Sequence, residues 1–149
     1  MGIAKPGAVF FASITLVSLA LAPSWFTVLP RLDHGVATIA AFAFFSKLCH
    51  QRPDRSLIVF GSQTAVCIRC LGIYSGAALG SLLPLKHATA IRTLIAAIVL
   101  NCLDVATESL HFHSNLPLLR LLIGGMLGIA AGAMLRTSSE ATAVHTLGS

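Results

Sequence analysis

The sequence predicts an all-α integral membrane protein, a bundle of about five transmembrane helices. Of its 149 residues, 56% are hydrophobic and only 10% are charged, whereas soluble globular chains carry roughly 25% charged residues. The mean hydropathy is +0.86. A chain of this length cannot bury so much apolar side chain in a core of its own, so lipid must cover the remainder.

The positive charge of the chain is scattered. The formal net charge is +5, but the basic residues stand singly near the ends of apolar segments and never form a run with interleaved aromatics. This pattern favours anchoring and orientation in a bilayer and argues against a nucleic-acid partner. By length the chain is one transmembrane domain, residues 1–135, followed by a polar C-terminal tail, residues 136–149.

The first two helices are predicted at Ala8–Leu29 and Gly35–Leu48. The first is long enough to cross roughly 30 Å of hydrocarbon. It resembles a signal peptide, but Pro23 directly follows Ala20-Leu21-Ala22 and disfavours cleavage, so we expect a retained helix. The second is short for a span, and the bundle has four crossings if either of the two is not a full span.

A polar loop at Gln51–Thr64 comes next, with an apolar patch, Leu57–Phe60, that we expect to lie in the membrane interface. Pro53 and Gly61 mark it as a loop. Three further helices are predicted after it, at Ala65–Leu83, Ala88–Ala106 and Leu116–Leu135.

Five crossings put the two termini on opposite sides of the membrane and gather the polar side chains at one face. Six of the ten Lys and Arg residues share that face, which favours a cytoplasmic orientation in a prokaryotic inner membrane. The co-facial residues that this threading predicts are Cys49, His50, Cys67, Cys70, Asp104, Glu108, His111, His113 and Arg120.

Glycines recur at four-residue spacing in the third and fifth predicted helices. Small residues at this interval let helix backbones approach closely in lipid. We expect these helices to pack tightly against each other or against another subunit, in a homo-oligomer or a larger membrane complex. The glycines concerned are Gly72, Gly76, Gly80, Gly124, Gly128 and Gly132.

Cys67 and Cys70 form a C-x-x-C motif at the start of a predicted helix, and this motif has two main uses. The helix N-terminus and nearby arginines can lower a thiol pKa and create a redox-active thiolate. Alternatively, the two sulfurs coordinate a soft metal, usually zinc. Small apolar packing is a third reading for membrane cysteines, and it is favoured for Cys102, which has no partner in sequence.

Cys49 and one histidine would complete a Cys₃His ligand set. The candidates are His50, His111 and His113. Because Cys49 and His50 are adjacent in sequence, both would rarely reach one metal, and a loop histidine is the better fourth ligand.

Polar residues on the same face are predicted to support this site. Asn101, Asp104 and Glu108 form a stripe on one helix, and ionisable groups in such a place are functional candidates. Asp104 could alternatively pair with Arg69 or Arg120. The supporting set is Arg52, Arg55, Ser56, Arg69, Tyr74, Asp104, Glu108, Asn115 and Arg120.

Two blocks of this sequence resemble the signature of a family of small prokaryotic membrane proteins known only as a domain of unknown function. The first block is Cys49-His50-Gln51, Pro53, Arg55-Ser56, Gly61 and Val66-Cys67-x-Arg69-Cys70-x-Gly72-Ile73-Tyr74-x-Gly76. The second is Asp104, Ser114-Asn115, Arg120, Gly124 and Gly128. The chain departs from the pattern at Ala65, at Leu71 and after Asp104. The resemblance implies a multi-pass membrane protein with a shared Cys/His site, and it brings no established activity.

The favoured function is therefore a membrane protein with a Cys/His metal site, with zinc or another soft transition metal as cofactor. Its role would be structural or sensing, as an accessory subunit of a larger assembly in the bilayer. The alternative is a membrane thiol-disulfide oxidoreductase with Cys67 and Cys70 as the redox pair, so the sequence leaves open whether the protein is an enzyme. A transporter would rest on Asp104, Glu108 and the histidines alone, and five helices without an inverted repeat are few for that task.

Overall fold

The computed structural model describes residues 6–28, 34–110 and 116–147. Helices account for most of this part of the chain. The elements, in order, are α1 (Pro6–Val28), α2 (His34–Phe45), the short 3₁₀ helix η1 (Pro53–Arg55), β1 (Ser56–Val59), β2 (Ser62–Cys67), α3 (Ile68–Leu82), α4 (His87–Ser109) and α5 (Pro117–Leu147).

A two-stranded antiparallel sheet corrects the all-α prediction. Strands β1 and β2 pair with Val59 opposite Ser62, so Phe60 and Gly61 alone form the turn. Both have positive φ, 49° and 79°, as the tight two-residue hairpin turn requires. The segment predicted as an irregular interfacial loop is thus a hairpin, and Ile58 and Phe60 are exposed on it.

The sheet also shifts the start of the third helix. We predicted it near Ala65, but β2 continues through Cys67 and α3 begins at Ile68. At the other end of the chain, α5 extends to Leu147, twelve residues beyond the predicted end at Leu135. Helix α4 continues to Ser109, which places Glu108 on the helix near its end.

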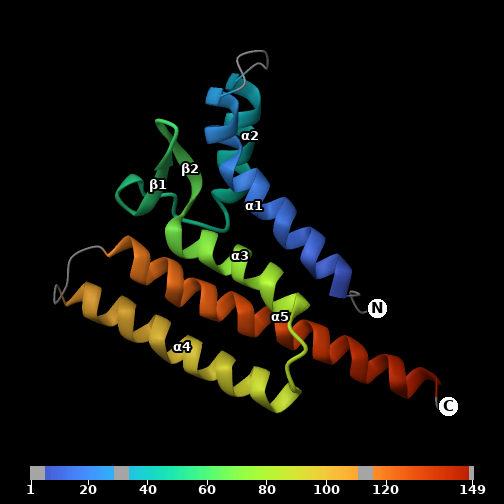
Figure 1. Cartoon of the computed structure of the whole chain (residues 1–149). Helices are drawn as coiled ribbons and strands as arrows, with labels where there is room; N and C mark the ends of the chain where they lie inside the picture. The colour runs from blue at the N-terminus through green and yellow to red at the C-terminus, as the bar shows by residue number, and fades with distance from the viewer. Residues whose placement is uncertain (1–5, 29–33, 111–115, 148–149) are drawn as a thin grey trace.

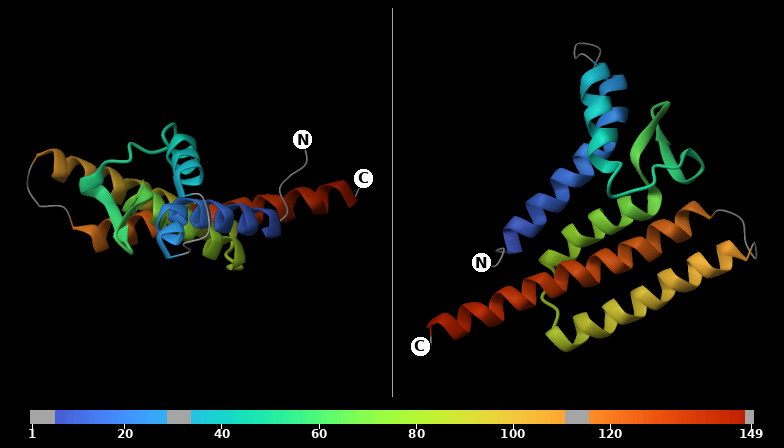
Figure 2. Two further views of the ribbon diagram at one scale, coloured as in Figure 1. Left: turned by 90° about the horizontal axis from the view of Figure 1, so that it is seen from above. Right: turned by 180° about the vertical axis from the view of Figure 1, so that it is seen from behind.

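Helices α3, α4 and α5 lie side by side in one layer, with α5 in the middle (Figures 1 and 2). Helix α1 packs along α3, and α2 folds back beside the C-terminal half of α1. A small hydrophobic core joins α1, α2 and β2, and its buried members are Ala20, Ala41, Phe45, Cys49, Ala65 and Val66.

Glycines form the contact between α3 and α5. A Cβ added at Gly76 would lie 2.2 Å from the carbonyl oxygen of Gly125, and one at Gly128 would lie 2.1 Å from that of Ile73. The other four glycines of the two repeats show the same crowding, at 2.1–2.4 Å. The backbones therefore touch directly, and no larger residue fits between them without displacing a helix.

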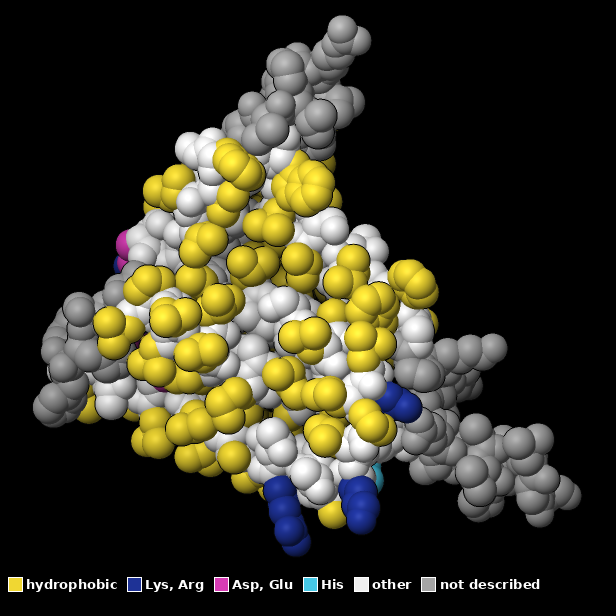
Figure 3. All heavy atoms as spheres, viewed as in Figure 1, with side chains coloured by type: hydrophobic (Ala, Val, Ile, Leu, Met, Phe, Trp, Pro, Cys, Tyr) yellow, Lys and Arg dark blue, Asp and Glu magenta, His cyan; other side chains and the backbone are white. Residues whose placement is uncertain are grey.

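Three of the described helices are long and apolar enough to cross a membrane: Gly7–Trp25, His87–Ser109 and Pro117–Ser138. Hydrophobic side chains cover the face formed by α1, α3 and α4 (Figure 3). Helix α2 has 12 residues and α3 has 15, about 18 Å and 22 Å at 1.5 Å per residue. Five full spans are therefore not supported, although a helical membrane protein is.

The described ends of the chain lie together, which differs from the prediction. The start of α1 and the end of α5 lie at the same end of the molecule, away from the hairpin (Figures 1 and 2). The reason is that α2 is a short helix folded back beside α1 at the hairpin end. It does not form a separate crossing of the layer.

Candidate functional site

Cys49 is held just beyond the end of α2. The chain leaves the helix in a tight turn, in which the Cys49 amide donates to the Phe45 carbonyl at 2.8 Å. The residue is 7% exposed and belongs to the hydrophobic core around Phe45. Its position is therefore set by the packing of α2 against α1 and β2.

Cys67 and Cys70 are placed by the junction between β2 and α3. Cys67 has an extended backbone and is the N-cap residue of α3, and Cys70 follows in the first turn. The backbone amide of Cys67 donates to the Cys49 sulfur at 3.2 Å. The Sγ atoms of Cys49, Cys67 and Cys70 all lie within 4.8 Å of one another.

These three cysteines form a compact group of soft ligands. Hydrogen bonds from the thiols of Cys67 and Cys70 hold the pKa of the Cys49 thiol well below its ordinary value, so one sulfur of the group is poised to be a thiolate. Thiolates are the form that binds metals and reacts with disulfides. The three cysteines are thus positioned to hold a metal ion, and they are equally close enough to exchange a disulfide.

Gln51 connects the segments that carry these cysteines. Its side-chain amide donates to the carbonyls of Phe42 in α2, at 2.7 Å, and Ala65 in β2, at 3.0 Å. The Gln63 amide donates in turn to the Gln51 carbonyl at 3.1 Å. We did not predict Gln51 as a site residue, although its place beside Cys49 and His50 in the first sequence block was a signal.

A cavity of about 410 Å³ opens beside the sulfurs. It is lined by residues of the segment after α2, of the β2–α3 junction and of the first turns of α5. The lining residues are Leu48, Cys49, His50, Arg52, Arg55, Cys67, Arg69, Cys70 and Arg120.

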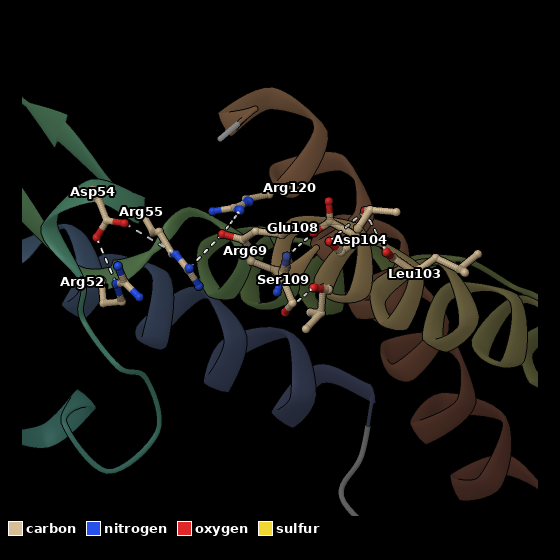
Figure 4. A network of polar contacts seen from close by, with 11 residues as sticks. Arg52, Asp54, Arg55, Arg69, Leu103, Asp104, Glu108, Ser109 and Arg120 are labelled. Atoms are coloured by element: carbon tan, nitrogen blue, oxygen red, sulfur yellow. Dashed lines mark hydrogen bonds and ion pairs between the residues drawn. The ribbon is translucent and has the colours of Figure 1, made fainter. Parts of the chain in front are cut away.

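Ion pairs connect the arginines of the cavity to three carboxylates (Figure 4). Glu108, near the end of α4, lies between Arg55 and Arg120, at 2.8 Å and 2.5 Å from their Nη2 atoms. Arg69 pairs with Asp104, whose carboxylate side chain is 2% exposed. Arg52 meets Asp54 at 3.1 Å, and this contact holds the pKa of the exposed Asp54 carboxyl below its usual value.

The predicted site residues fall into four groups. The cysteines and Arg52, Arg55, Arg69, Arg120, Asp104 and Glu108 meet around the cavity. His50 is exposed at its edge and is not among the ligand atoms grouped with the three sulfurs. The predictions for His111, His113 and Asn115 lie outside the described residues.

Tyr74 and Ser56 lie apart from the cavity lining. The Tyr74 ring stacks at a tilt on Phe45, with ring centroids 6.0 Å apart. The Ser56 hydroxyl donates to the Arg52 carbonyl at 3.0 Å and closes the 3₁₀ turn before β1. Cys102 is exposed and is not part of the sulfur group.

Two relatives of this chain are archaeal proteins described as uncharacterized. One, from Methanocaldococcus jannaschii, is 32% identical over 98 residues, which cover 61% of this chain and 63% of the relative. The other, from Methanothermobacter thermautotrophicus, is 30% identical over 95 residues, 60% of this chain and 86% of the relative. The chain thus spans less than two thirds of the first relative. No solved structure matches it significantly.

A family model described as "Predicted membrane protein (DUF2085)" matches residues 49–134, more than half of the chain. The match begins at Cys49 and continues into α5, so it contains all three grouped cysteines, the four arginines of the cavity and the glycine contact. The resemblance read from the two sequence blocks is confirmed. The chain belongs to the DUF2085 family of predicted membrane proteins.

Proposed function

We propose that this protein is an inner-membrane metalloprotein in which Cys49, Cys67 and Cys70 bind one zinc ion. The observation that carries the proposal is the mutual approach of the three Sγ atoms within 4.8 Å. Zinc bonds to thiolate sulfur at about 2.3 Å, which separates two sulfurs of a tetrahedral site by roughly 3.8 Å. Small side-chain rotations suffice to reach that spacing.

The chemistry of the group supports a soft metal. Three sulfur ligands favour zinc or another thiophilic ion over magnesium or calcium. The hydrogen bonds that lower the pKa of the Cys49 thiol also reduce the proton competition that a metal must overcome. The fourth ligand is a histidine, either His50 at the cavity edge or one of His111 and His113.

A metal in this place has a structural consequence. It ties the end of α2 to the start of α3, which are otherwise joined by the hydrogen bonds of Gln51 and by the hydrophobic core around Phe45. Structural zinc sites contribute directly to folding free energy. We infer a structural or sensing role, in an accessory subunit of a membrane assembly.

The orientation follows from the positive charges. Lys47, Arg52, Arg55, Arg69 and Arg120 lie toward the hairpin end, against Lys86, Arg92 and Arg136 toward the other. Under the positive-inside rule this distribution favours a cytoplasmic site.

Elemental analysis of protein purified anaerobically in detergent tests the metal. We expect about one zinc per chain, lost in Cys49→Ser, Cys67→Ser and Cys70→Ser because each removes a ligand. The exposed Cys102 supplies the matched control, and Cys102→Ser should keep its metal. Metal-free intact protein, or equal loss in Cys102→Ser, contradicts the proposal.

A second function uses the same sulfurs. Because Cys67 caps α3 and arginines surround the group, the geometry also suits a thiol-disulfide oxidoreductase. Cys67 and Cys70 would give two electrons and two protons to a quinone as their disulfide forms. The Cys49 thiolate would then attack that disulfide, forming a mixed disulfide with one cysteine and releasing the other as a thiolate. A Cys67–Cys70 disulfide detected by mass spectrometry in protein trapped from cells favours this function, and reduced metal-bound thiols favour the first.

A further inference from the structure

The cavity beside the cysteines presents arginines on its inner surface and keeps the carboxylates outside. In the part of the chain that the structure describes, four arginines line it, but neither Asp nor Glu does. Asp54, Asp104 and Glu108 pair with these arginines without lining the cavity. Glu108 bridges Arg55 and Arg120, so the carboxylates orient the guanidinium groups from outside the cavity lining.

Several buried donors of these arginines lack acceptors. The Arg120 side chain is 3% exposed, and its Nε has no hydrogen-bond partner among the described residues. The buried Nε atom of Arg69 also has no hydrogen-bond partner, and that of Arg55 has only an ion pair with Asp54 at 3.7 Å. Buried polar groups are nearly always paired, and a charged donor left unpaired is unfavourable.

The charge count alone does not require a ligand. Four arginines face three carboxylates, an excess of one positive charge that is too small to carry the inference. The inference rests on the unfilled hydrogen-bond donors of three converging guanidinium groups. An oxyanion is the kind of acceptor that satisfies several such groups at once.

We propose that this cavity binds a phosphate-class oxyanion, as free phosphate or as the phosphate of a lipid headgroup. A tetrahedral phosphate presents enough oxygens to accept from more than one guanidinium fork. The volume of about 410 Å³ lies in the range of small-ligand sites. The site stands on the arginines and does not depend on a bound metal.

The experiment measures binding to the purified full chain by calorimetry, with inorganic phosphate in detergent. A second arm uses nanodiscs of phosphatidylcholine with and without phosphatidylglycerol, in which a headgroup ligand raises thermal stability. We expect Arg55→Gln to weaken binding on the order of tenfold or more, since it removes a charge-assisted donor. Arg52→Gln, at a more exposed lining residue, should weaken binding less.

Two controls separate this proposal from the metal site and from general charge effects. Arg92→Gln removes an exposed arginine near the other end of α4, and it should bind phosphate like the unaltered protein. Unaltered protein stripped of zinc by a chelator should keep phosphate binding, and Arg55→Gln should keep its zinc, so either proposal can fail alone.

The outcomes distinguish a free anion, a lipid headgroup and no oxyanion ligand. Saturable phosphate binding that depends on Arg55 supports a free anion. Stabilisation only by phosphatidylglycerol, with the same dependence, supports a headgroup. Absence of both effects, or equal weakening in Arg92→Gln and Arg55→Gln, overturns the proposal.

Discussion

Gln51 shows how one residue can organise a site that it does not line. Its backbone has φ of 51°, in the left-handed region that non-glycine residues seldom adopt. The side chain compensates by donating to Phe42 and Ala65. The carbonyl of Phe42, in the last turn of α2, also accepts from the Ser46 amide at 2.9 Å, so Gln51 adds a second hydrogen bond to it.

Replacing Gln51 by Glu tests this function, because the side chain keeps its shape but can no longer donate to both carbonyls as a carboxylate. We expect the free energy of unfolding in detergent to fall by about 1–3 kcal/mol, because two part-buried hydrogen bonds are lost and a carboxylate then faces two carbonyl oxygens. Metal content should fall with it, since Cys49 loses its fixed position.

Gln63→Glu is the matched control for this substitution. Gln63 donates a single hydrogen bond, to the Gln51 carbonyl, so the loss of stability should be smaller. Equal stability of Gln51→Glu and the unaltered protein would show that α2 and β2 are joined by apolar packing alone.

The pairing of Cys67 and Cys70 could be predicted from the sequence. Which other residues approach these two cysteines could not. C-x-x-C spacing at a helix start puts Cys67 and Cys70 about one turn apart whatever the rest of the fold does. The approach of Cys49 depends on the turn after α2 and on the packing of α1 against β2. Periodicity in a sequence carries no information on such contacts.

The α3–α5 pair is the element whose tertiary packing follows most directly from its sequence. Glycines at four-residue spacing leave the backbone uncovered along one side of each helix, and the two uncovered sides are in contact. Because an added Cβ meets backbone atoms here, the contact cannot adjust as it could around a flexible side chain.

Alanine substitutions at the adjacent Gly124 and Gly125 distinguish the effect of helix packing on stability from the effect of helix propensity. A Cβ at Gly124 would lie 2.3 Å from the Arg69 carbonyl oxygen, whereas one at Gly125 has only a 3.9 Å contact with the Gly72 oxygen. We expect Gly124→Ala to lower the free energy of unfolding by about 1–3 kcal/mol through overpacking. Gly125→Ala should be neutral or stabilise by up to about 1 kcal/mol.

Thermal unfolding of the two variants in one detergent measures this difference. The two residues share a helix, a depth and a residue type, so lipid or detergent effects cancel in the comparison. Similar unfolding temperatures for Gly124→Ala and Gly125→Ala would mean that α3 and α5 separate easily.

The hairpin is the element that sequence reasoning missed. Leu57, Ile58 and Val59 have side chains typical of strands, but Phe60 occupies a turn position where Asn or Asp is the usual signal. A four-residue strand also falls below the length at which an alternating pattern is distinct. Pairing with β2 and ion pairing of Arg55 with Glu108 stabilise what local preference does not specify.

At the scale of the whole molecule, the arrangement predicts four crossings. If α1, α4 and α5 span the bilayer, α3 must also cross, because it returns the chain from the hairpin end to the start of α4 (Figure 1). Helix α3 is short for a span, but it is in contact with α1 on one side and with α5 on the other. Helix α2 remains at the hairpin end.

Topology reporters fused ahead of α1 and after Leu147 test this arrangement. We expect both to report the same side of the membrane, and a cysteine-reactive probe to reach the hairpin, through Ile58→Cys, from the opposite side. With a cytoplasmic site, the positive-inside rule places both reporters outside.

Two results would count against four crossings. Reporters on opposite sides would restore the five-span threading. Labelling of Ile58→Cys from the reporter side would put the site at the wrong end. Cys102→Ser should serve as the background, since it removes the native cysteine that the helix bundle leaves exposed on α4.

From the sequence alone follow the membrane environment, the helical character and the meeting of polar residues at one end. These properties depend on composition, on the length of the apolar segments and on their order, and all three can be read directly from the sequence. The glycine repeats of α3 and α5 can also be read from the sequence, because the four-residue spacing by itself allows two helices to approach closely.

The tertiary structure alone decided that the termini lie together, that a hairpin precedes α3 and that four arginines surround the cysteines. Each depends on contacts between residues distant in sequence, such as Gln51 with Ala65 or Arg55 with Glu108. Such contacts form only when α1 and α2 pack on β2 and the ends of α4 and α5 close around them. The physical reason is that packing and charge pairing act through space, whereas the signals in a sequence act over a few neighbouring residues.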